Sequence, residues 1–428
     1  TQRGYEIVAF DQKADVYIIN TCSVTNIADR KSRQMLHRAK KLNPEAVVVA
    51  AGCYVQVASD ALKEDDSVDI IVGNNNKARL ADILEEYMKD RQGDEDGYVL
   101  DIARAREYEE LHVSRLGEHT RAFIKVQDGC NQFCSYCIIP YARGRVRSRK
   151  PEDVEAEVKG LVARGYREVV LTGIHLSSYG TEHMEGSPVK GGDWDSGPLW
   201  DLIERIHRVE GLERIRLGSL EPRIITREFA EKLAGLPEFC PHFHLSLQSG
   251  CDATLKRMNR HYTTEDYLRR CGILREIFDH PAITTDVIAG FPGETEEEFE
   301  ETRRFLETVR FYEMHVFKYS KRQGTRAAVM EDQVPEQVKA RRSDVLLELE
   351  KTMSRRYRER FAGKRVSVLF EEAAEMEGKW YMTGYTPQYV KAALLLEDGM
   401  DRKQLAGRIM ELSASGLLND EVLKVEFS

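Results

Sequence analysis

Short β-branched runs alternate with longer polar segments along the first third of the chain. The apolar runs lie at 16–20 (VYIIN), 47–51 (VVVAA) and 69–72 (DIIV), and polar stretches of helical character separate them. This alternation is typical of βαβ units, in which the strands pair in parallel. The pattern therefore predicts an N-terminal parallel α/β domain over residues 1–100. The charged, aperiodic stretch from Lys89 to Gly117 is predicted to be a linker.

The central part of the chain repeats the strand and helix alternation. Helical patterns separate six strand candidates, and the helix after Thr295 opens with an acidic run (GETEEEFEE) that suits the positive end of a helix dipole. Six successive βα units predict a partial (β/α)6 barrel over residues 119–355, with chemistry in the loops at the carboxyl ends of the strands. The expected strands are 121–127, 168–172, 214–218, 242–247, 283–289 and 313–318.

The last section, residues 363–428, is a series of short strand patterns punctuated by glycine. Such spacing predicts a small all-β barrel or sandwich. The fold class is therefore α/β, with a small C-terminal β domain.

Length and composition limit the possible classes of protein. A chain of 428 residues with 42% apolar and 32% charged residues predicts two or three globular domains. No run approaches the roughly 18 apolar residues that a membrane helix needs, so we expect no membrane association and a cytoplasmic protein. The net charge of −9 argues against a uniformly basic nucleic-acid binder but allows a local basic face.

Three of the eight cysteines, Cys130, Cys134 and Cys137, lie within eight residues directly after the first strand of the central domain. A zinc module normally supplies four ligands, whereas this C-x₃-C-x₂-C spacing supplies three. Three thiolates on an iron-sulfur cubane leave one iron open for a substrate. Zinc with a remote fourth ligand and three buried structural cysteines are the alternatives. Cys240, Cys251 and Cys271 show no ligand spacing and are expected to be structural.

The segment CNQFCSYC resembles the signature of the radical S-adenosylmethionine (SAM) enzymes. The resemblance implies that Cys130, Cys134 and Cys137 hold a [4Fe-4S] cluster whose open iron binds SAM. An electron from the cluster then cleaves SAM to a 5′-deoxyadenosyl radical. Tyr136 matches the position of an aromatic residue near the adenine in that family.

Polar residues at the ends of the other strands agree with this resemblance. Thr172 and Gly173 fall at the family's site for the SAM amino group, and the segment from Asp286 resembles the one along the adenine. Each polar side chain taken singly could equally cap a loop. The predicted cofactor-binding residues are Tyr136, Thr172, Gly173, Ser219, Glu221, Gln248 and Asp286.

Cys22 and Cys53 each follow a strand of the N-terminal domain by one residue or two, and are thus expected at one edge of its sheet. Together with the barrel and a final β domain resembling a TRAM domain, they make the chain similar to the methylthiotransferases. In that family three N-terminal cysteines hold an auxiliary cluster, implicated in supplying sulfur. The third is expected upstream of Thr1, and the alternative is a cluster with fewer protein ligands. The implied cofactors are two [4Fe-4S] clusters and SAM, which is both radical source and methyl donor.

Two basic runs favour an RNA substrate. Residues 141–150 carry five basic and no acidic residues, and residues 318–326 carry four and none. Both runs leave strand ends, where they could contact phosphates, and a solvated loop is the alternative. The predicted RNA contacts are Arg143, Arg145, Arg147, Arg149, Lys321 and Arg322. The C-terminal domain is acidic overall, so it would bind RNA only through particular residues, for which Arg365, Lys379, Tyr381 and Lys391 are candidates.

The sequences of three segments, TGIHLSSYG, HLSLQSG and VFKYSKRQGT, most resemble those of the branch that methylthiolates N6-threonylcarbamoyladenosine in tRNA. The implied partners are the tRNA anticodon stem-loop and an electron donor such as flavodoxin or ferredoxin, and a monomer is expected. Isopentenyladenosine in tRNA or an aspartate of a ribosomal protein are alternative substrates. A non-catalytic, zinc-stabilised RNA-binding protein is the alternative of another class.

Overall fold

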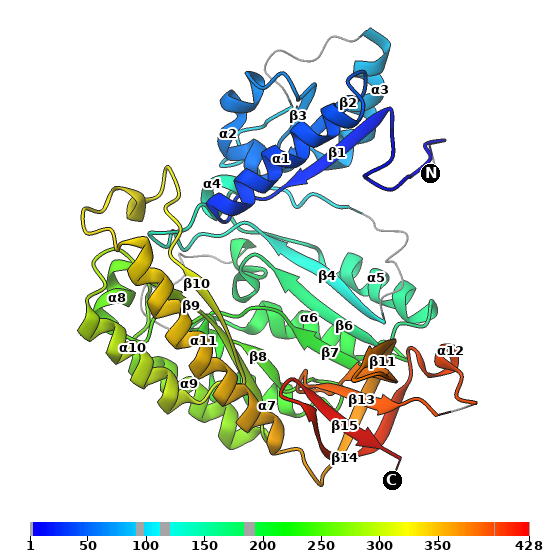
Figure 1. Ribbon diagram of the computed structural model, residues 1–428, viewed down its shortest axis with the longest axis vertical. Coiled ribbons are helices and arrows are strands. Elements are labelled where there is room, and N and C mark those ends of the chain that lie inside the picture. The colour runs from blue at the N-terminus through cyan, green and yellow to red at the C-terminus, as the bar shows by residue number, and fades with distance from the viewer. Residues whose placement is uncertain (1–2, 91–97, 112–119, 184–192, 398, 428) are drawn as a thin grey trace. The chain divides into compact units, whose positions relative to one another are not determined.

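The computed structural model describes residues 3–90, 98–111, 120–183, 193–397 and 399–427, which form two compact units (Figure 1). The first unit comprises Thr1–Val113, Asp128–Arg147 and Ser320–Val329, and the second comprises Ser114–Gln127, Ser148–Tyr319 and Met330–Ser428. The cysteine loop and the second basic run thus pack with the N-terminal sheet. The domain boundaries expected from the sequence stay a prediction.

The first unit contains the predicted parallel α/β sheet. Strand β2 alternates its side chains between two apolar clusters, with Val48 and Ala50 in one and Val47 and Val49 in the other. This two-sided burial explains why the strand is apolar throughout. The sheet has the order β1-β2-β3, with β1 Val16–Thr21, β2 Val47–Gly52 and β3 Ile70–Val72. The helices are α1 Asn26–Leu42, α2 Cys53–Lys63, η1 Lys77–Arg79 and α3 Leu80–Asp90.

The linker predicted for residues 89–117 is partly wrong, because Tyr98 within it pairs with the N-terminal sheet. Tyr98 bridges Val72 in parallel, with Gly73 N donating to Tyr98 O at 3.0 Å and Tyr98 N to Ile71 O at 3.0 Å. Ile102 is buried. Backbone pairing needs no side-chain periodicity, which is why the sequence pattern missed it. Residues 91–97 and 112–117 of the expected linker lie outside the described residues.

The second unit contains the six predicted parallel strands of a partial barrel, and the two-residue strand β5, which was not predicted, lies beside β4. Two groups of strands, ordered β5-β4-β6-β7 and β10-β9-β8, are connected by a bridge between Leu220 and Leu245. Strand β8 is shorter than expected, because beyond His244 its pairing continues only as isolated bridges, from Leu245 to Leu220 and from Gln248 to Val287. The bounds are β4 Arg121–Asp128, β5 Arg147–Ser148, β6 Glu168–Gly173, β7 Arg214–Leu217, β8 His242–His244, β9 Ala282–Ala289 and β10 Glu313–Lys318.

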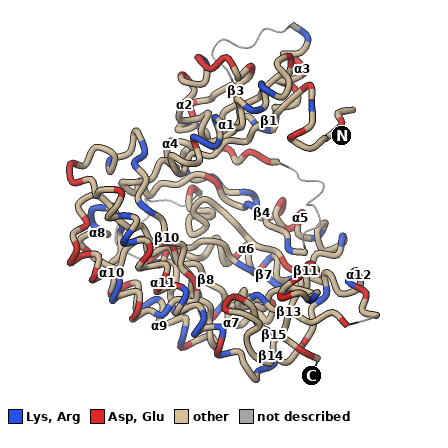
Figure 2. The backbone as a smooth tube through the Cα atoms, viewed as in Figure 1, with Lys and Arg blue, Asp and Glu red and all other residues tan. Residues whose placement is uncertain are grey.

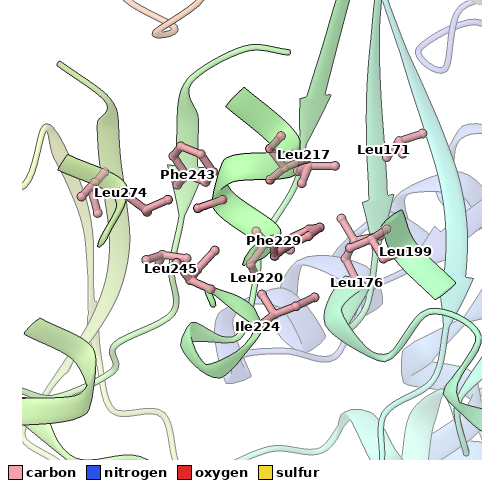
Figure 3. Close-up of a cluster of buried hydrophobic side chains, with 14 of the residues drawn as sticks. Leu171, Leu176, Leu199, Leu217, Leu220, Ile224, Phe229, Phe243, Leu245 and Leu274 are labelled. Carbon is pink, nitrogen blue, oxygen red and sulfur yellow. The ribbon is translucent and has the colours of Figure 1, made fainter. Parts of the chain in front are cut away.

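Helices cover the outer face of the barrel strands and bury one apolar core. Figure 3 shows Leu171, Leu217 and Leu245 of the strand segments among side chains such as Phe229 and Leu274 of the helices. Basic and acidic residues are interspersed along α9, α10 and α11 (Figure 2). The helices of the second unit are α5 Pro151–Ala163, α6 Gly197–His207, α7 Arg227–Ala234, α8 Asp252–Arg257, α9 Thr264–Ile277, α10 Glu296–Val309 and α11 Glu336–Glu359, whereas α4 Ile139–Ala142 belongs to the first unit. The single-turn helices are η2 Leu176–Ser178, η3 Thr181–His183, η4 Pro222–Ile224 and η5 Arg326–Val329.

The C-terminal strands close into a barrel, as one of the two sequence interpretations predicted. Its apolar core includes Tyr312 and Tyr357 of the preceding segment, so this barrel packs against the rest of the second unit. Tyr381, a candidate RNA contact, is only 4% exposed and is withdrawn. The strand order is β11-β12-β13-β15-β14, with β11 Arg365–Met376, β12 Lys379–Tyr385, β13 Lys391–Leu395, β14 Ile409–Asn419 and β15 Val422–Glu426, and α12 is Arg402–Leu405.

Buried arginines fasten this barrel to the strands of the second unit. Arg214 donates to Tyr385 O at 2.9 Å, and Arg216 donates to Pro387 O at 2.7 Å. Fully buried Glu168 lies 2.8 Å from Arg216 Nε and 3.6 Å from Arg214 Nη1. One carboxylate therefore offsets two buried positive charges at this junction. Among the described residues, no helix is both long and apolar enough to cross a membrane.

Glu168→Gln is expected to lower the free energy of unfolding by about 3 to 5 kcal/mol, because it leaves buried guanidinium groups without their counter-charge. Urea unfolding followed by circular dichroism measures this loss. Glu204→Gln is the matched control, since Glu204 and its partner Arg208 are exposed and their pair should contribute less than about 1 kcal/mol. Equal losses in the two variants would contradict the assigned role of Glu168.

Candidate active site

Cys22 and Cys53 lie at equivalent places on one sheet edge, as the sequence predicted. Thr21 at the end of β1 pairs with Gly52 at the end of β2, and each cysteine follows its paired residue directly. Gly52 has a φ of 105°, and a Cβ there would lie 2.7 Å from Thr21 O. Only glycine fits this turn. Cys22 is exposed, whereas Cys53 is buried as the first residue of α2.

The loop with Cys130, Cys134 and Cys137 begins where β4 ends. Cys130 N donates to Gly144 O at 3.0 Å, and Cys137 N donates to Cys134 O at 3.0 Å. A Cβ on Gly129 would lie 1.8 Å from Arg145 O, so the two ends of the loop touch through their backbones. The result is a closed loop that presents three reduced thiols.

The Arg143 guanidinium connects this loop with the N-terminal cysteines. Its Nε donates to Cys53 Sγ at 3.0 Å, and its Nη1 lies 3.5 Å from Asp128 Oδ2. Burial opposes the charge, but Cys53, Asp128 and Cys22 together raise the pKa of Arg143. Asn74 Nδ2 gives Cys53 Sγ a second contact at 3.6 Å and also donates to Ala142 O at 2.7 Å. The two N-terminal cysteines and the three cysteines of the loop therefore belong to one compact unit.

The second basic run packs against the same elements. Ala327 N donates to Ser135 O at 2.8 Å, inside the cysteine loop. Arg322 lies 2.7 Å from Asp29 Oδ2, and also donates to Ser23 Oγ at 2.8 Å, next to Cys22. The second basic run is thus anchored beside Cys22, and the residue that follows it is bonded to the cysteine loop.

Three of the six predicted RNA contacts, Arg147, Arg149 and Arg322, are buried by intramolecular bonds, and a fourth, Arg143, is partly buried and also bonded within the chain. The Arg147 side chain is 1% exposed and donates to Arg143 O and Arg145 O, both at 2.9 Å. Arg149 pairs with Glu157 at 2.5 Å, while Arg143 and Arg322 make the contacts given above. We withdraw these four as phosphate contacts because their charges are already engaged. Arg145 and Lys321 are exposed and remain.

The predicted SAM residues of the second unit differ in what their side chains do. The Glu221 carboxylate caps η4 and pairs with Arg223 Nε at 2.7 Å, while only 2% exposed. The Glu221 carboxylate therefore stabilises its own loop, as the alternative to SAM binding predicted. Thr172 Oγ1 donates to Ile124 O at 3.2 Å, whereas Ser219 is exposed. Gly173 ends β6 and is partly exposed, as is Tyr136 in the first unit.

Asp286 and Gln248 lie beside two histidines that the sequence reasoning missed. Gln248 N donates to Asp286 O at 2.9 Å. Asp286 Oδ2 is 3.2 Å from Nε2 of buried His244, whose ring stacks on His315 at 5.7 Å. Potential ligand atoms of His244, Asp286 and His315 lie within 4.8 Å of one another, on three adjacent strands. The alternation of side chains along β8 and β10 is the sequence signal that could have predicted His244 and His315 on the same face of the sheet.

His175, at the strand end after Gly173, was also missed. Its Nδ1 lies 2.6 Å from Ser178 Oγ, while its Nε2 is buried and has no hydrogen-bond partner among the described residues. Burial, with Arg260 and Arg223 nearby, lowers the pKa of His175 to about 3. The imidazole is thus neutral at physiological pH.

The donor sets fit the cofactors expected for such a loop. Soft thiolates suit iron-sulfur clusters, and around one zinc ion they would lie within about 4 Å of one another. The loop offers three thiolates within eight residues, which is one fewer than a closed zinc site needs. Burial raises the pKa of Cys240 to about 11 and of Cys271 to about 12, which keeps these cysteines protonated and supports a structural role.

Two family models match the chain. The Radical SAM superfamily matches residues 124–306, and the uncharacterized protein family UPF0004 matches residues 1–73. Two solved structures of TsrM, a radical S-adenosylmethionine methyltransferase from Kitasatospora setae, are similar in fold. One of them, with cobalamin and a [4Fe-4S] cluster bound, has a TM-score of 0.55 and 16% identity, covering 74% of this chain and 64% of that one.

Curated relatives match nearly the whole chain. The threonylcarbamoyladenosine tRNA methylthiotransferase MtaB of Bacillus subtilis is 42% identical over 96% of this chain and 88% of its own length. The enzyme of that name from Aquifex aeolicus is 42% identical, covering 87% of each chain. A tRNA-2-methylthio-N(6)-dimethylallyladenosine synthase of Clostridium botulinum is 37% identical over 86% of this chain and 80% of its own.

His175→Asn is expected to reduce the pH dependence of stability. The unfolded chain binds a proton to His175 near pH 6.5, whereas the folded chain does so only near pH 3. Stability should therefore fall as pH decreases from about 6.5, and the variant should lose less. Urea midpoints at pH 7.5 and pH 5 measure the difference. His183→Asn, at an exposed histidine, is the control, and identical pH dependence in all three proteins would refute the buried-histidine assignment.

Proposed function

We propose that this chain, which belongs to the radical-SAM tRNA methylthiotransferase family, adds a methylthio group at C2 of N6-threonylcarbamoyladenosine beside the tRNA anticodon. The observation that carries the proposal is the 42% identity to MtaB of Bacillus subtilis over 96% of the chain. The gathering of all five candidate ligand cysteines in one compact unit supports it.

In the proposed mechanism, Cys130, Cys134 and Cys137 hold the cluster that binds SAM. The bound cluster and SAM supply the electron, the radical and the methyl group. The chain's own contribution is position: the closed loop presents three thiolates, and Tyr136 lies between two of them. Thr172, Gly173, Ser219, Gln248 and Asp286 are proposed to contact SAM, and the engaged carboxylate of Glu221 is left out.

Cys22 and Cys53 are proposed to ligate the auxiliary cluster of the family. Arg143 positions Cys53 through its 3.0 Å contact with the sulfur. Hydrogen bonds to cluster sulfurs tune reduction potential, and such outer contacts orient ligands. Because Arg143 belongs to the loop that carries Cys130, Cys134 and Cys137, it fixes the position of Cys53 relative to these three cysteines.

Arg145 and Lys321 are proposed to bind phosphates of the anticodon stem-loop. We further propose a TRAM-like role for the C-terminal barrel, a cytoplasmic location, a monomeric state, and flavodoxin or ferredoxin as electron donor. The dimethylallyladenosine relatives are 37% identical and the threonylcarbamoyladenosine relatives reach 42%, which favours the latter substrate.

Replacing Cys22 and Cys53 with alanine should leave SAM cleavage intact and abolish methylthio insertion into tRNA. Insertion needs sulfur at bonding distance from the reacting carbon. Nucleoside mass spectrometry and the 5′-deoxyadenosine yield are measured on one sample, with Cys251→Ala as a control for a buried cysteine outside both sets. Alanine at Cys130, Cys134 and Cys137 should abolish both products.

Each outcome of this experiment separates two parts of the proposal. Normal insertion by the double variant would remove Cys22 and Cys53 from the auxiliary site. A wild-type protein that methylthiolates dimethylallyladenosine instead would replace the proposed substrate by the alternative one. 5′-Deoxyadenosine from the triple variant would refute the radical-SAM loop.

Arg145→Gln with Lys321→Gln should weaken tRNA binding and reduce the slope of log affinity against log salt by roughly one for each phosphate that the protein no longer neutralises. Both side chains are exposed, so their replacement should not disturb folding. Lys159→Gln, at an exposed lysine of α5, is the control. An unchanged affinity and slope would show that the two basic side chains are only solvated surface.

A further inference from the structure

Three side chains of the cysteine loop form a cluster that the sequence analysis did not use. The Arg145 guanidinium carbon lies 4.6 Å from the centroid of the Phe133 ring, a cation–π contact. Phe133 in turn meets Tyr141 edge-on, with centroids 5.9 Å apart and planes at 81°. Tyr141 is 49% exposed and Arg145 is exposed, so aromatic and guanidinium surface reaches solvent here.

The backbone holds these side chains in place. Tyr141 lies in helix α4, and its N donates to Ile138 O at 3.0 Å. Phe133 has a φ of 49°, an uncommon conformation for a bulky residue. The carbonyl of Arg145 is fixed by its close approach to Gly129. A strained, closed loop that displays an aromatic pair indicates a surface shaped before it binds its ligand.

The charge around the cluster selects the kind of ligand. The adjoining segment contacts the cysteine loop through the Ala327–Ser135 hydrogen bond and carries exposed Lys321 and Arg326. Unpaired bases stack on aromatic rings and on arginine planes while nearby basic residues bind the phosphates. An exposed tyrosine ring among exposed positive charges fits single-stranded RNA better than an apolar peptide.

We propose that Phe133, Tyr141 and Arg145 form a stacking platform for one unpaired base of the RNA loop that carries the modified adenosine. The inference rests on the proposed function and adds to it the residues that hold the RNA loop by stacking. Tyr141 supplies the exposed ring, Phe133 supports it, and Arg145 offers both a second plane and a charge. Stacking on a ring is tolerant of base identity, so the platform would position the loop rather than select its sequence.

The test uses a fluorescently labelled anticodon stem-loop with 2-aminopurine placed at each unpaired loop position in turn. Tyr141→Leu should weaken binding about fivefold or more and abolish the quenching of one 2-aminopurine. Tyr141→Phe should retain both, because the ring stays. The salt dependence should be the same for wild type and Tyr141→Leu, since no charge is removed.

Matched variants separate stacking from folding and from charge. Tyr5→Leu, at a tyrosine 37% exposed in the same unit, should bind like wild type. Phe133→Leu should weaken binding and quenching as Tyr141→Leu does, and both should keep the wild-type circular dichroism spectrum. Arg145→Gln should lower the salt slope as well, which distinguishes its charge from the rings.

Unchanged affinity and quenching in Tyr141→Leu and Phe133→Leu, with a wild type that binds and modifies the RNA, would overturn the platform alone. A wild type that neither binds the stem-loop nor methylthiolates it would overturn the proposed function, and the platform with it. An equal loss in Tyr141→Phe and Tyr141→Leu would assign the effect to the phenol hydroxyl and refute stacking.

Discussion

Parallel strand pairing is the constraint on which the candidate site depends. Parallel strands end at a common edge, and a residue that follows one strand end lies beside the residue that follows the next. The pairing of Thr21 with Gly52 brings Cys22 and Cys53 to one edge in this way. In the second unit the same rule places Gly173 and Ser219 at the ends of adjacent strands β6 and β7.

Buried and partly buried arginines join segments that are distant in sequence. Arg143 contacts Cys53 and Asp128, and Arg322 contacts Asp29 and Ser23. A charge is costly to bury unless it is paired, so each guanidinium holds its partner in a defined place. The same residue type on the same loop behaves differently when exposed, as Arg145 does, because its charge then remains available to a ligand.

The C-terminal barrel is held to the neighbouring strands by local polar contacts. Its backbone carbonyls accept hydrogen bonds from Arg214 and Arg216, although the domain is acidic overall. Polar contacts of this kind are set by local geometry rather than by total charge. The barrel also shares an apolar core with Tyr312 and Tyr357, which makes it part of the second unit.

The sequence by itself determined most of the strands, the helix start at Thr295, and the cysteine motif, since each depends on neighbours within a few residues. Hydrophobic periodicity and ligand spacing are local properties, and a resemblance of motifs carried the family. Tertiary structure alone decided which arginines are buried, that Glu221 caps a loop, and that Tyr98 extends the N-terminal sheet. It also brought His244 to His315, which lie on different strands. Those outcomes depend on which segments meet after folding, and composition and spacing carry no record of such long-range contacts.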